Sequence, residues 1–276
     1  MKKESHFNNS DLPIIEGKVY HLGLKPEELA NHILIVGDPE RVPCIAQEYF
    51  KTIETDKSHR GLRTITGIVR DTGQRVSVVT SGMGTPSLEI VLNEIIALNE
   101  MDFHTRTRKS VCDMLTVIRV GTSGSIQPDT ELGTLIITDY AIGLDNTGFF
   151  YDCTYPEKNM EILEEKIKVA VDSSIPVNSR SGFFANQGRT LSRIPLTVSE
   201  IDSILSVVDT GIEGLRIENM EMEASFLLYF MGALGYRAGV ISVVIDNRRE
   251  DRFIAQYERH ISDASKAALR ALATLQ

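Results

Sequence analysis

Five apolar runs, rich in valine and isoleucine, recur along the chain, and each ends near a glycine or a charged residue. Most are apolar at nearly every position, which is typical of strands that are buried on both faces of a sheet. We therefore predict a sheet covered by helices, with one strand in each of these runs: His32–Asp38, Arg75–Gly84, Leu115–Gly124, Gly133–Gly143 and Ala238–Arg248.

Helical patterns lie between and after these runs. Pro86–Glu100 carries one apolar stripe at helical spacing and has a proline near its start. Ala224–Gly235 is apolar almost all round and stops at glycine, which predicts a buried helix. Ile254–Leu275 predicts a long amphipathic helix that closes the chain.

This alternation of strands and helices predicts the α/β class. We expect a single domain over residues 1–276, with a central mixed, largely buried β-sheet flanked by helices. Residues 1–18 are expected to form a flexible N-terminal extension. The basic segment His104–Asp113 is interpreted as a solvated loop, and residues 192–217 as a loop and a helix over the sheet edge.

Composition narrows the possible partners. The 276 residues carry a formal net charge of -9, so a general nucleic-acid-binding surface is not expected, although a local arginine cluster could still bind a small anion. Cys44, Cys112 and Cys153 are widely spaced and odd in number, which argues against disulfides and against a zinc site, and we expect no metal. The sequence shows neither a signal peptide nor a membrane span, and we expect a cytoplasmic protein.

Polar residues and glycines follow the predicted strands, where α/β sheets bind their ligands. Gly37 and Arg41 follow the first strand, and Asp246 follows the last. Arg119 lies inside an otherwise apolar strand; burying a guanidinium is costly unless it meets an anion, so Arg119 binds either an anionic substrate or an internal carboxylate. The glycine loops at residues 121–126 and 81–87 lack the further residues of a P-loop or a dinucleotide fingerprint.

Glu221 and Glu223 stand two positions apart, just before the apolar helix. They share a face only if the segment is extended. Such carboxylates could hold the two hydroxyls of a ribose, because an ionised carboxylate only accepts hydrogen bonds, or they could stabilise the start of the helix. Both interpretations remain open from the residues alone.

Seven motifs occur in an order that resembles the nucleoside phosphorylases of the trimeric/hexameric superfamily, and most closely the uridine phosphorylase branch. They run nearly end to end: VYHLGL (19–24), VGDPERV (36–42), SHR (58–60), SGMGTPS (81–87), RVGTSGSIQPD (119–129), GFFANQGR (182–189) and EMEA (221–224). The resemblance implies reversible phosphorolysis of uridine to uracil and ribose 1-phosphate. It requires no cofactor, since phosphate is a co-substrate, and it implies a homo-oligomer, a dimer or a hexamer, with sites shared between subunits.

The same resemblance implies roles for individual residues. The phosphate would be bound by Gly37, Arg41, Arg119, Thr122 and, from a neighbouring subunit, Arg60. The ribose would meet Thr122, Met222, Glu223 and the adjacent subunit's His21. The base would be held by Ser123, Gly124, Phe183, Gln187, Arg189 and Glu221, with Phe183 stacking on it and Gln187 and Arg189 bonding its polar edge. Arg119, Arg189 and Glu223 would be the catalytic residues.

Two positions and one segment depart from the uridine pattern. Gly61 stands where the bacterial uridine enzymes commonly carry a glutamate that helps bind a monovalent cation, so no cation is carried over. The segment 104–115 is longer than in those enzymes, which leaves the oligomer size open. Asp246 stands where the purine branch has its catalytic aspartate, unless it caps the strand end or pairs with Arg248 or Arg249. The alternatives are therefore a purine nucleoside phosphorylase, a nucleosidase or a nucleoside sensor without activity.

Overall fold

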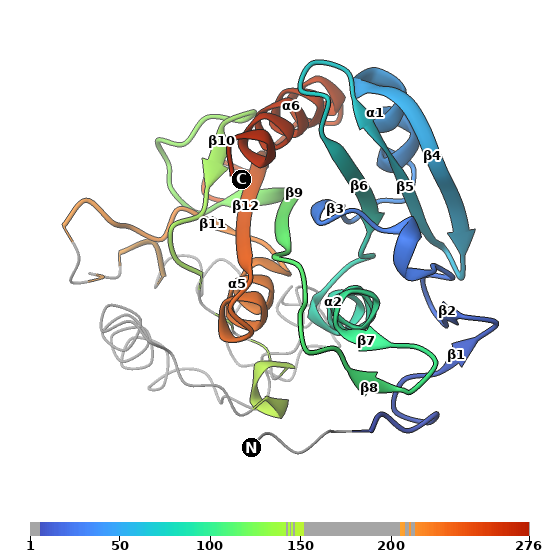
Figure 1. Cartoon of the computed structure of the whole chain (residues 1–276). Coiled ribbons are helices and arrows are strands. Elements are labelled where there is room, and N and C mark those ends of the chain that lie inside the picture. Colours follow the sequence, from blue (N-terminus) through green and yellow to red (C-terminus); the bar gives the residue numbers. More distant parts are fainter. Residues whose placement is uncertain are drawn as a thin grey trace. The chain divides into compact units, whose positions relative to one another are not determined.

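The structure is a computed structural model that describes residues 6–141, 143, 145, 147–151, 205–207, 210 and 213–275. The chain divides into two compact units. The first unit comprises Met1–Val120, Tyr236–Ala238 and Ser265–Gln276, and the second comprises Gly121–Gly235 and Gly239–Ala264. Strands β9 (Thr116–Ser125) and β12 (Arg237–Asn247) each begin in the first unit and end in the second (Figure 1).

The described strands form a mixed nine-stranded sheet in the order β10-β12-β9-β3-β6-β5-β4, with β11 paired to β9 and β13 paired to β12. In the first unit, β3 (His32–Val36) runs parallel to both β6 (Arg75–Thr80) and β9. Every side chain of β3 after His32 is fully buried. The sheet class predicted from the sequence is confirmed, as are the strands predicted at β3, β6, β9 and β12.

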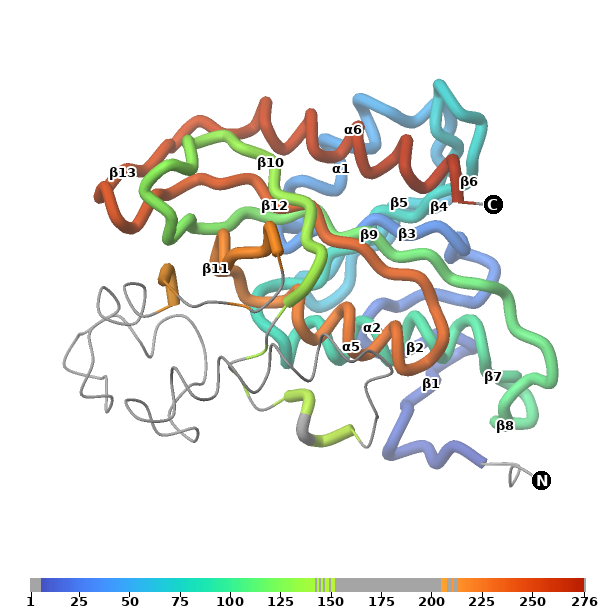
Figure 2. Tube along the Cα trace, turned by 90° about the vertical axis from the view of Figure 1, so that its left-hand side faces the viewer, coloured from blue at the N-terminus to red at the C-terminus, as the bar shows by residue number. Residues whose placement is uncertain are grey.

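Helices cover the first unit's part of the sheet. Figure 2 shows α1 (Arg41–Tyr49) on one face and α2 (Thr85–Glu100) on the other. The predicted apolar stripe of α2 is confirmed, because its five members are buried: Leu88, Val91, Leu92, Ile95 and Ile96. Helix α6 (Glu258–Thr274) begins four residues later than expected, after Tyr257.

The hairpin β4 (Phe50–His59) and β5 (Leu62–Val69) extends the sheet beyond β6, and the sequence analysis predicted neither strand. Strand β4 is the sheet edge, and most of its side chains are exposed and polar. An edge strand of this kind lacks the apolar runs that mark buried strands, and its charged residues also discourage pairing with another chain. Helix α1, which directly precedes β4 in the sequence, was not predicted either.

Short elements complete the first unit: β1 (Ile14–Ile15), β2 (Lys18–Val19), η1 (Pro26–Glu28), β7 (Met101–Asp102) and β8 (Thr107–Arg108). Because β8 pairs with β7, the expectation of a loop over His104–Asp113 is wrong at Thr107–Arg108. The Arg106 side chain donates hydrogen bonds to the carbonyls of Phe7, Asn8 and Leu12. The flexibility of residues 1–18 and the single-domain organisation stay predictions.

The second unit contains the ends of β9 and β12 together with β10 (Leu135–Ile137), η2 (Thr147–Phe150), β11 (Asn219–Met220), α5 (Ala224–Ala233) and β13 (Arg252–Phe253). Strand β10 corrects one expectation: it has three residues, lies at the sheet edge, and leaves Ile137 73% exposed. A run of three apolar residues at an edge therefore looks like a buried strand in sequence without being one. Helix α5 buries Phe226, Leu227 and Phe230, as predicted. None of the described helices is long and apolar enough to cross a membrane.

Candidate active site

Three predicted phosphate residues of the first unit lie on or just after the adjacent strands β3 and β9. Gly37 follows β3, and Arg119 lies on β9 directly opposite Ile35 of β3. The Arg119 side chain is buried, with 4% of the residue exposed. Arg41 begins α1 immediately after the turn that follows Gly37. Gly37 and Arg41 thus follow the carboxyl end of a parallel strand, where such sheets bind ligands, and Arg119 of β9 lies level with that end.

Gly37 stands where a side chain would not fit easily. A Cβ at this position would lie 3.2 Å from the carbonyl oxygen of Gly82, in the loop after β6. Ser87 holds that loop, because its Oγ donates a 2.6 Å hydrogen bond to the carbonyl of Ser81. The glycines predicted to let backbone approach a ligand thus also let the ends of β3 and β6 approach each other.

Arg60 and Gly61 form the turn between β4 and β5, and both have positive φ, at 54° and 78°. A two-residue hairpin loop with positive φ at both positions is a type I′ turn, which favours glycine at its second position. This turn gives a physical reason for Gly61 in place of the glutamate of the uridine pattern. Arg60 adopts a conformation that costs a non-glycine residue about 1 kcal/mol or more, and strain of this kind is common at functional positions.

Arg60 and His21, the two residues expected to serve a neighbouring subunit, are linked through Tyr20 and His59. The Arg60 guanidinium lies 5.2 Å from the centre of the Tyr20 ring, and its Nη1 donates to the Tyr20 hydroxyl at 3.3 Å. The ring Nδ1 of His59 lies 3.1 Å from the carbonyl oxygen of His21. Two predictions from separate motifs therefore converge on one corner of the first unit.

Glu94 is a residue of this corner that sequence reasoning missed. Its carboxylate lies on α2, is almost fully buried, and contacts the backbone and the ring of His21. A signal was present in the sequence, since Glu94 follows Val91 by three positions and so falls on the apolar stripe of the helix. A carboxylate on a buried stripe requires partners, and here they come from the segment around His21.

In the second unit, the carboxylate of Asp246 lies against the backbone of Gly124. A Cβ added to Gly124 would lie 2.5 Å from Oδ2 of Asp246 and 2.8 Å from Oδ1. The neighbouring Ser123 is 5% exposed, and its Oγ makes no hydrogen bond in the part of the chain that the structure describes. The structure thus brings the possible purine-type acid against Gly124, one of the residues expected to line the base pocket.

Glu221 and Glu223 have different surroundings. Both carboxylate oxygens of Glu221 accept hydrogen bonds from the backbone N–H of Glu223, at 3.0 and 3.1 Å, and one also accepts from that of Ala224. Glu221 therefore caps the start of α5, one of the two interpretations left open by the sequence. Glu223 precedes the helix with φ at -137° and is 4% exposed. Met222 lies between them, partly exposed.

Strand β11 brings this segment to β9. Met220 is paired with Gly124, and Asn219 with Ser125. The Oγ of Ser125 donates to the carbonyl of Glu218 at 2.9 Å, just before β11. Backbone pairing within the second unit therefore joins β9, which carries predicted base-binding residues, to the segment that leads into the predicted ribose-binding residues.

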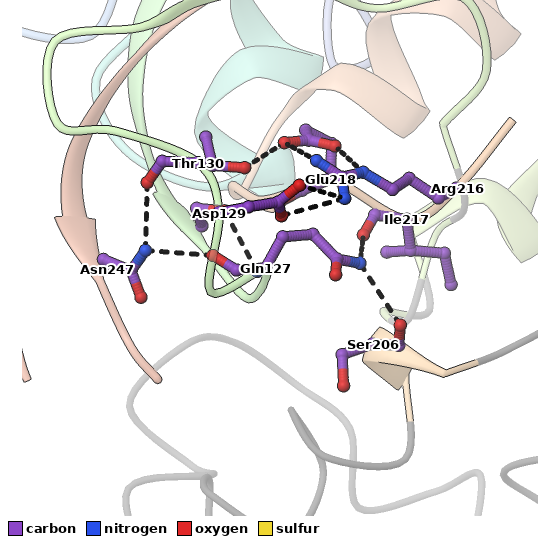
Figure 3. A network of polar contacts seen from close by, with 9 residues as sticks. Gln127, Asp129, Thr130, Ser206, Arg216, Ile217, Glu218 and Asn247 are labelled. Atoms are coloured by element: carbon purple, nitrogen blue, oxygen red, sulfur yellow. Dashed lines mark hydrogen bonds and ion pairs between the residues drawn. The ribbon is translucent and has the colours of Figure 1, made fainter. Parts of the chain in front are cut away.

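A polar network fixes the loops after β9 and β12 (Figure 3). Asn247 is 1% exposed, and its Nδ2 donates to the carbonyls of Gln127 and Thr130 at 2.9 and 3.0 Å. The Oδ1 of Asn247 accepts from the backbone N–H of Arg249 and Glu250. Since Asn247 follows Asp246 directly, these bonds hold the end of β12 in place.

The same network continues to the segment before β11 (Figure 3). Gln127 Nε2 donates to the carbonyl of Ile217 at 2.6 Å, and Thr130 Oγ1 donates to the Glu218 carboxylate. Arg216 pairs with Glu218 and with Asp129. The hydrogen bonds from Arg216 lower the pKa of Asp129 below its usual value. The pKa of Arg216 is raised above its usual value, chiefly by its hydrogen bonds to Glu218 and then by those to Asp129.

Three predicted base-binding residues lie outside the described residues: Phe183, Gln187 and Arg189. No group of His, Cys, Asp and Glu among the described residues could hold a metal ion. The described residues thus provide two sets of residues that are predicted to contact the substrates. The first unit holds Gly37, Arg41, Arg60, Arg119 and His21, and the second holds Thr122, Ser123, Gly124, Met222, Glu223 and Asp246. Each set is built by strand ends and the loops that follow them.

Comparison with known proteins places the chain in a protein family. The sequence model of the Phosphorylase superfamily matches residues 31–275. A uridine phosphorylase of Thermococcus kodakarensis is 31% identical over 265 residues, covering 94% of this chain and 88% of that protein. A DeoD-type purine nucleoside phosphorylase of a Thermoanaerobacter species is 36% identical over only 127 residues, covering 44% of this chain and 48% of that protein.

A solved structure agrees. A Trypanosoma brucei nucleoside phosphorylase, reported to show uridine phosphorylase activity, superimposes with a TM-score of 0.81 at 29% identity, over 96% of this chain and 100% of that one. The mixed sheet with flanking helices is a nucleoside phosphorylase-like fold. The chain belongs to the phosphorylase superfamily, and within it to the nucleoside phosphorylases, which are pentosyltransferases.

Proposed function

We propose that this protein is a uridine phosphorylase that converts uridine and phosphate reversibly to uracil and ribose 1-phosphate. The observation that carries the proposal is the extent of similarity: the Thermococcus uridine phosphorylase match spans 94% of the chain, whereas the matches to DeoD-type purine enzymes span 44% to 60%. The residues GFFANQGR at 182–189 support the same base, because Gln187 offers both a donor and an acceptor to the N–H and C=O of uracil.

Phosphate is bound by Arg41 and Arg119, by the backbone at Gly37, by Thr122, and by Arg60 donated from a neighbouring subunit. Burial of the Arg119 guanidinium supports this role, since a buried cation is stabilised by an anion. Arginine presents a rigid fork of donors that matches the oxygens of phosphate. Holding the nucleophile in place before reaction can contribute about 7 kcal/mol or more to lowering the barrier.

In the reaction, a phosphate oxygen forms a bond to C1′ of the ribose while the bond from C1′ to N1 of uracil breaks, and N1 keeps the electron pair. Glu223 holds the ribose hydroxyls, Met222 packs on the sugar, and His21 of the adjacent subunit meets the 5′ side. Phosphate stabilises the positive charge that develops on the sugar. Arg189 and Gln187 stabilise the negative charge that develops on the uracil edge, where preorganised donors are most effective.

Phe183 stacks on the base, Ser123 and Gly124 line its pocket, and Glu221 steadies this side through its cap on α5. Release of uracil from uridine, followed by chromatography, tests the proposal. Arg189→Ala is expected to abolish most of this turnover in a folded protein; unchanged kinetics would show that the base is read elsewhere.

A second candidate function is phosphorolysis of purine nucleosides. The observation that favours it is the position of Asp246, whose carboxylate lies against Gly124 in the second unit. A carboxyl group there could protonate N7 of a purine leaving group, a nitrogen that uracil lacks. Brisk turnover of inosine or adenosine without uracil release from uridine would favour this candidate. Hydrolysis without phosphate would indicate a nucleosidase, and tight uridine binding without turnover would indicate a sensor.

A further inference from the structure

The carboxylate of Glu94 is committed almost entirely to one short segment. Its side chain is 3% exposed on α2, amid buried apolar neighbours. Oε1 accepts hydrogen bonds from the backbone N–H of His21 at 2.7 Å and lies 2.8 Å from the ring Nδ1 of the same residue. Oε2 accepts from the backbone N–H of Leu22 at 2.7 Å. Burying a carboxylate is costly, and three donors from adjacent positions compensate that cost.

These contacts determine which ring nitrogen of His21 carries the proton. An ionised carboxylate has no hydrogen to donate, so Nδ1 of His21 must be the donor. In the neutral imidazole, Nε2 is then left with its lone pair. The choice between tautomers is thus made by Glu94, in the way that carboxylates orient histidines in metal sites.

His21 is held on its remaining sides as well. Its carbonyl oxygen lies 3.1 Å from Nδ1 of His59, and its ring packs edge-on against Tyr20. Backbone N–H, backbone C=O and ring Nδ1 are therefore all engaged. Among the described residues nothing bonds to Nε2 of His21, and 30% of the side chain is exposed. A histidine fixed on every side but one is suited to binding an outside donor through that remaining atom.

We propose that Glu94 is a positioning residue that keeps His21 as the Nδ1–H tautomer, so that Nε2 accepts a hydrogen bond from the 5′-hydroxyl of the nucleoside. This inference rests on the proposed function, in which His21 meets the 5′ side of the ribose. It adds a specificity: nucleosides with a 5′-hydroxyl donor are preferred to 5′-deoxynucleosides. Glu94 itself touches no substrate.

Glu94→Gln tests the role of Glu94, because it keeps the shape but replaces one acceptor oxygen with a donor NH₂ group. Glu100→Gln is a matched control on the same helix. Glu100 is 9% exposed and accepts from Tyr236 Oη at 2.7 Å and Arg108 at 2.8 Å, so its loss also removes a buried carboxylate but leaves His21 untouched. Both variants are compared with the wild type by thermal unfolding.

The first readout is the tautomer of His21, measured by nitrogen NMR of histidine-labelled full-length protein at a pH where the ring is neutral. The signal is assigned by its absence in His21→Phe. We expect protonated Nδ1 in the wild type and in Glu100→Gln, and loss of this preference in Glu94→Gln. A wild-type His21 with its proton on Nε2 would overturn the inference, and this measurement requires no Glu94 variant to fold.

The second readout is KM for uridine and for 5′-deoxyuridine. Loss of one hydrogen bond to the nucleoside corresponds to about a tenfold loss of affinity. We expect Glu94→Gln to raise KM for uridine by about this factor, to leave KM for 5′-deoxyuridine nearly unchanged, and to change kcat little. An equal rise for both nucleosides, or the same rise in Glu100→Gln, would overturn the inference. If the wild type cleaves no nucleoside, the proposed function fails, and with it the recognition of the 5′-hydroxyl, while the tautomer measurement still decides whether Glu94 orients His21.

Discussion

The carboxylate of Asp246 occupies the space that a side chain at Gly124 would need, since a Cβ there would lie 2.5 Å from Oδ2. The two residues sit on β12 and β9, and each belongs to a segment that the sequence singled out for a different reason. Gly124 is part of the motif shared by the superfamily, whereas Asp246 departs from the uridine pattern. Their contact means that the two positions cannot be altered independently.

Gly124→Ala tests this contact. The added methyl group must displace the Asp246 carboxylate, and overpacking of this kind typically destabilises by about 1–3 kcal/mol. In an Asp246→Ala background, where the obstructing atoms are gone, the same change is expected to cost much less. Thermal or denaturant unfolding of the four proteins gives the coupling directly.

Gly232→Ala is the matched control, because Gly232 lies in α5 and, apart from its chain neighbours and its own helix backbone, no atom lies within 4 Å of an added Cβ. There alanine is expected to stabilise by about 1 kcal/mol through its higher helix propensity. Equal costs for Gly124→Ala with and without the Asp246 carboxylate would contradict the described contact.

Asp246→Asn tests which base the protein favours. The change preserves the size of the side chain but removes its ability to donate a proton as an acid. We expect uridine turnover to change less than about threefold, because uracil has no nitrogen that this carboxyl would protonate, and any activity on inosine or adenosine to fall by about 100-fold, the range of a lost general acid. A loss with uridine as large as that with inosine would assign Asp246 to the uridine reaction.

Arg60→Asn separates the strain of the turn from the proposed role in phosphate binding. Asparagine tolerates positive φ, and Asn-Gly is the favoured pair in a type I′ turn, so the folded protein is expected to be at least as stable as the wild type. The KM for phosphate is expected to rise, because a guanidinium is lost. Arg63→Asn is a control for charge, since Arg63 lies near the same turn but pairs with Asp56. A large loss of stability, or an unchanged KM for phosphate, would contradict the assignment.

Asp129→Asn tests the network of Figure 3 through pH. Arg216 lowers the pKa of Asp129, chiefly by donating hydrogen bonds from Nη1 to both carboxylate oxygens, at 2.9 and 3.0 Å. A lowered pKa gives stability that is fully present above the unfolded value of about 3.9 and is lost as pH falls through the folded value. The wild type should therefore melt at a higher temperature than Asp129→Asn at neutral pH, and the gap should close in acid. Asp71→Asn, an exposed carboxylate in a turn of the first unit, controls for the change in net charge. A gap that stays constant down to acid pH would mean that the ion pair contributes nothing.

Much of the sheet could be predicted because its central strands are apolar on both faces. Strands β3, β6, β9 and β12 are visible in the sequence as continuous apolar runs, and helix α2 as an apolar stripe at helical spacing. Hairpin β4–β5 could not be found in this way, because an exposed edge strand is polar and its partner β5 alternates only weakly. Strand β10 was wrongly predicted to be buried for the opposite reason, because an apolar run can also lie at an exposed sheet edge.

Candidate site residues could be named from the sequence only where they belong to a recognisable motif or break an apolar pattern. Arg119 stood out because an arginine inside an apolar strand requires an anion or a carboxylate. Glu94, Gln127 and Asn247 did not, because their importance depends on partners far away in sequence: Glu94 bonds residues more than 70 positions earlier, and Asn247 bonds Gln127, 120 positions earlier. Contacts of this range are set by the fold, and of these three residues only Glu94 has a local signal, its place on the apolar stripe of α2.

The most direct test of the central claim is the release of uracil from uridine by the purified wild-type protein, measured with and without phosphate and beside inosine, adenosine and thymidine. We predict release of uracil that requires phosphate, with formation of one ribose 1-phosphate for each uracil. Uridine left intact while inosine or adenosine is cleaved, or uracil release that is independent of phosphate, would contradict the account.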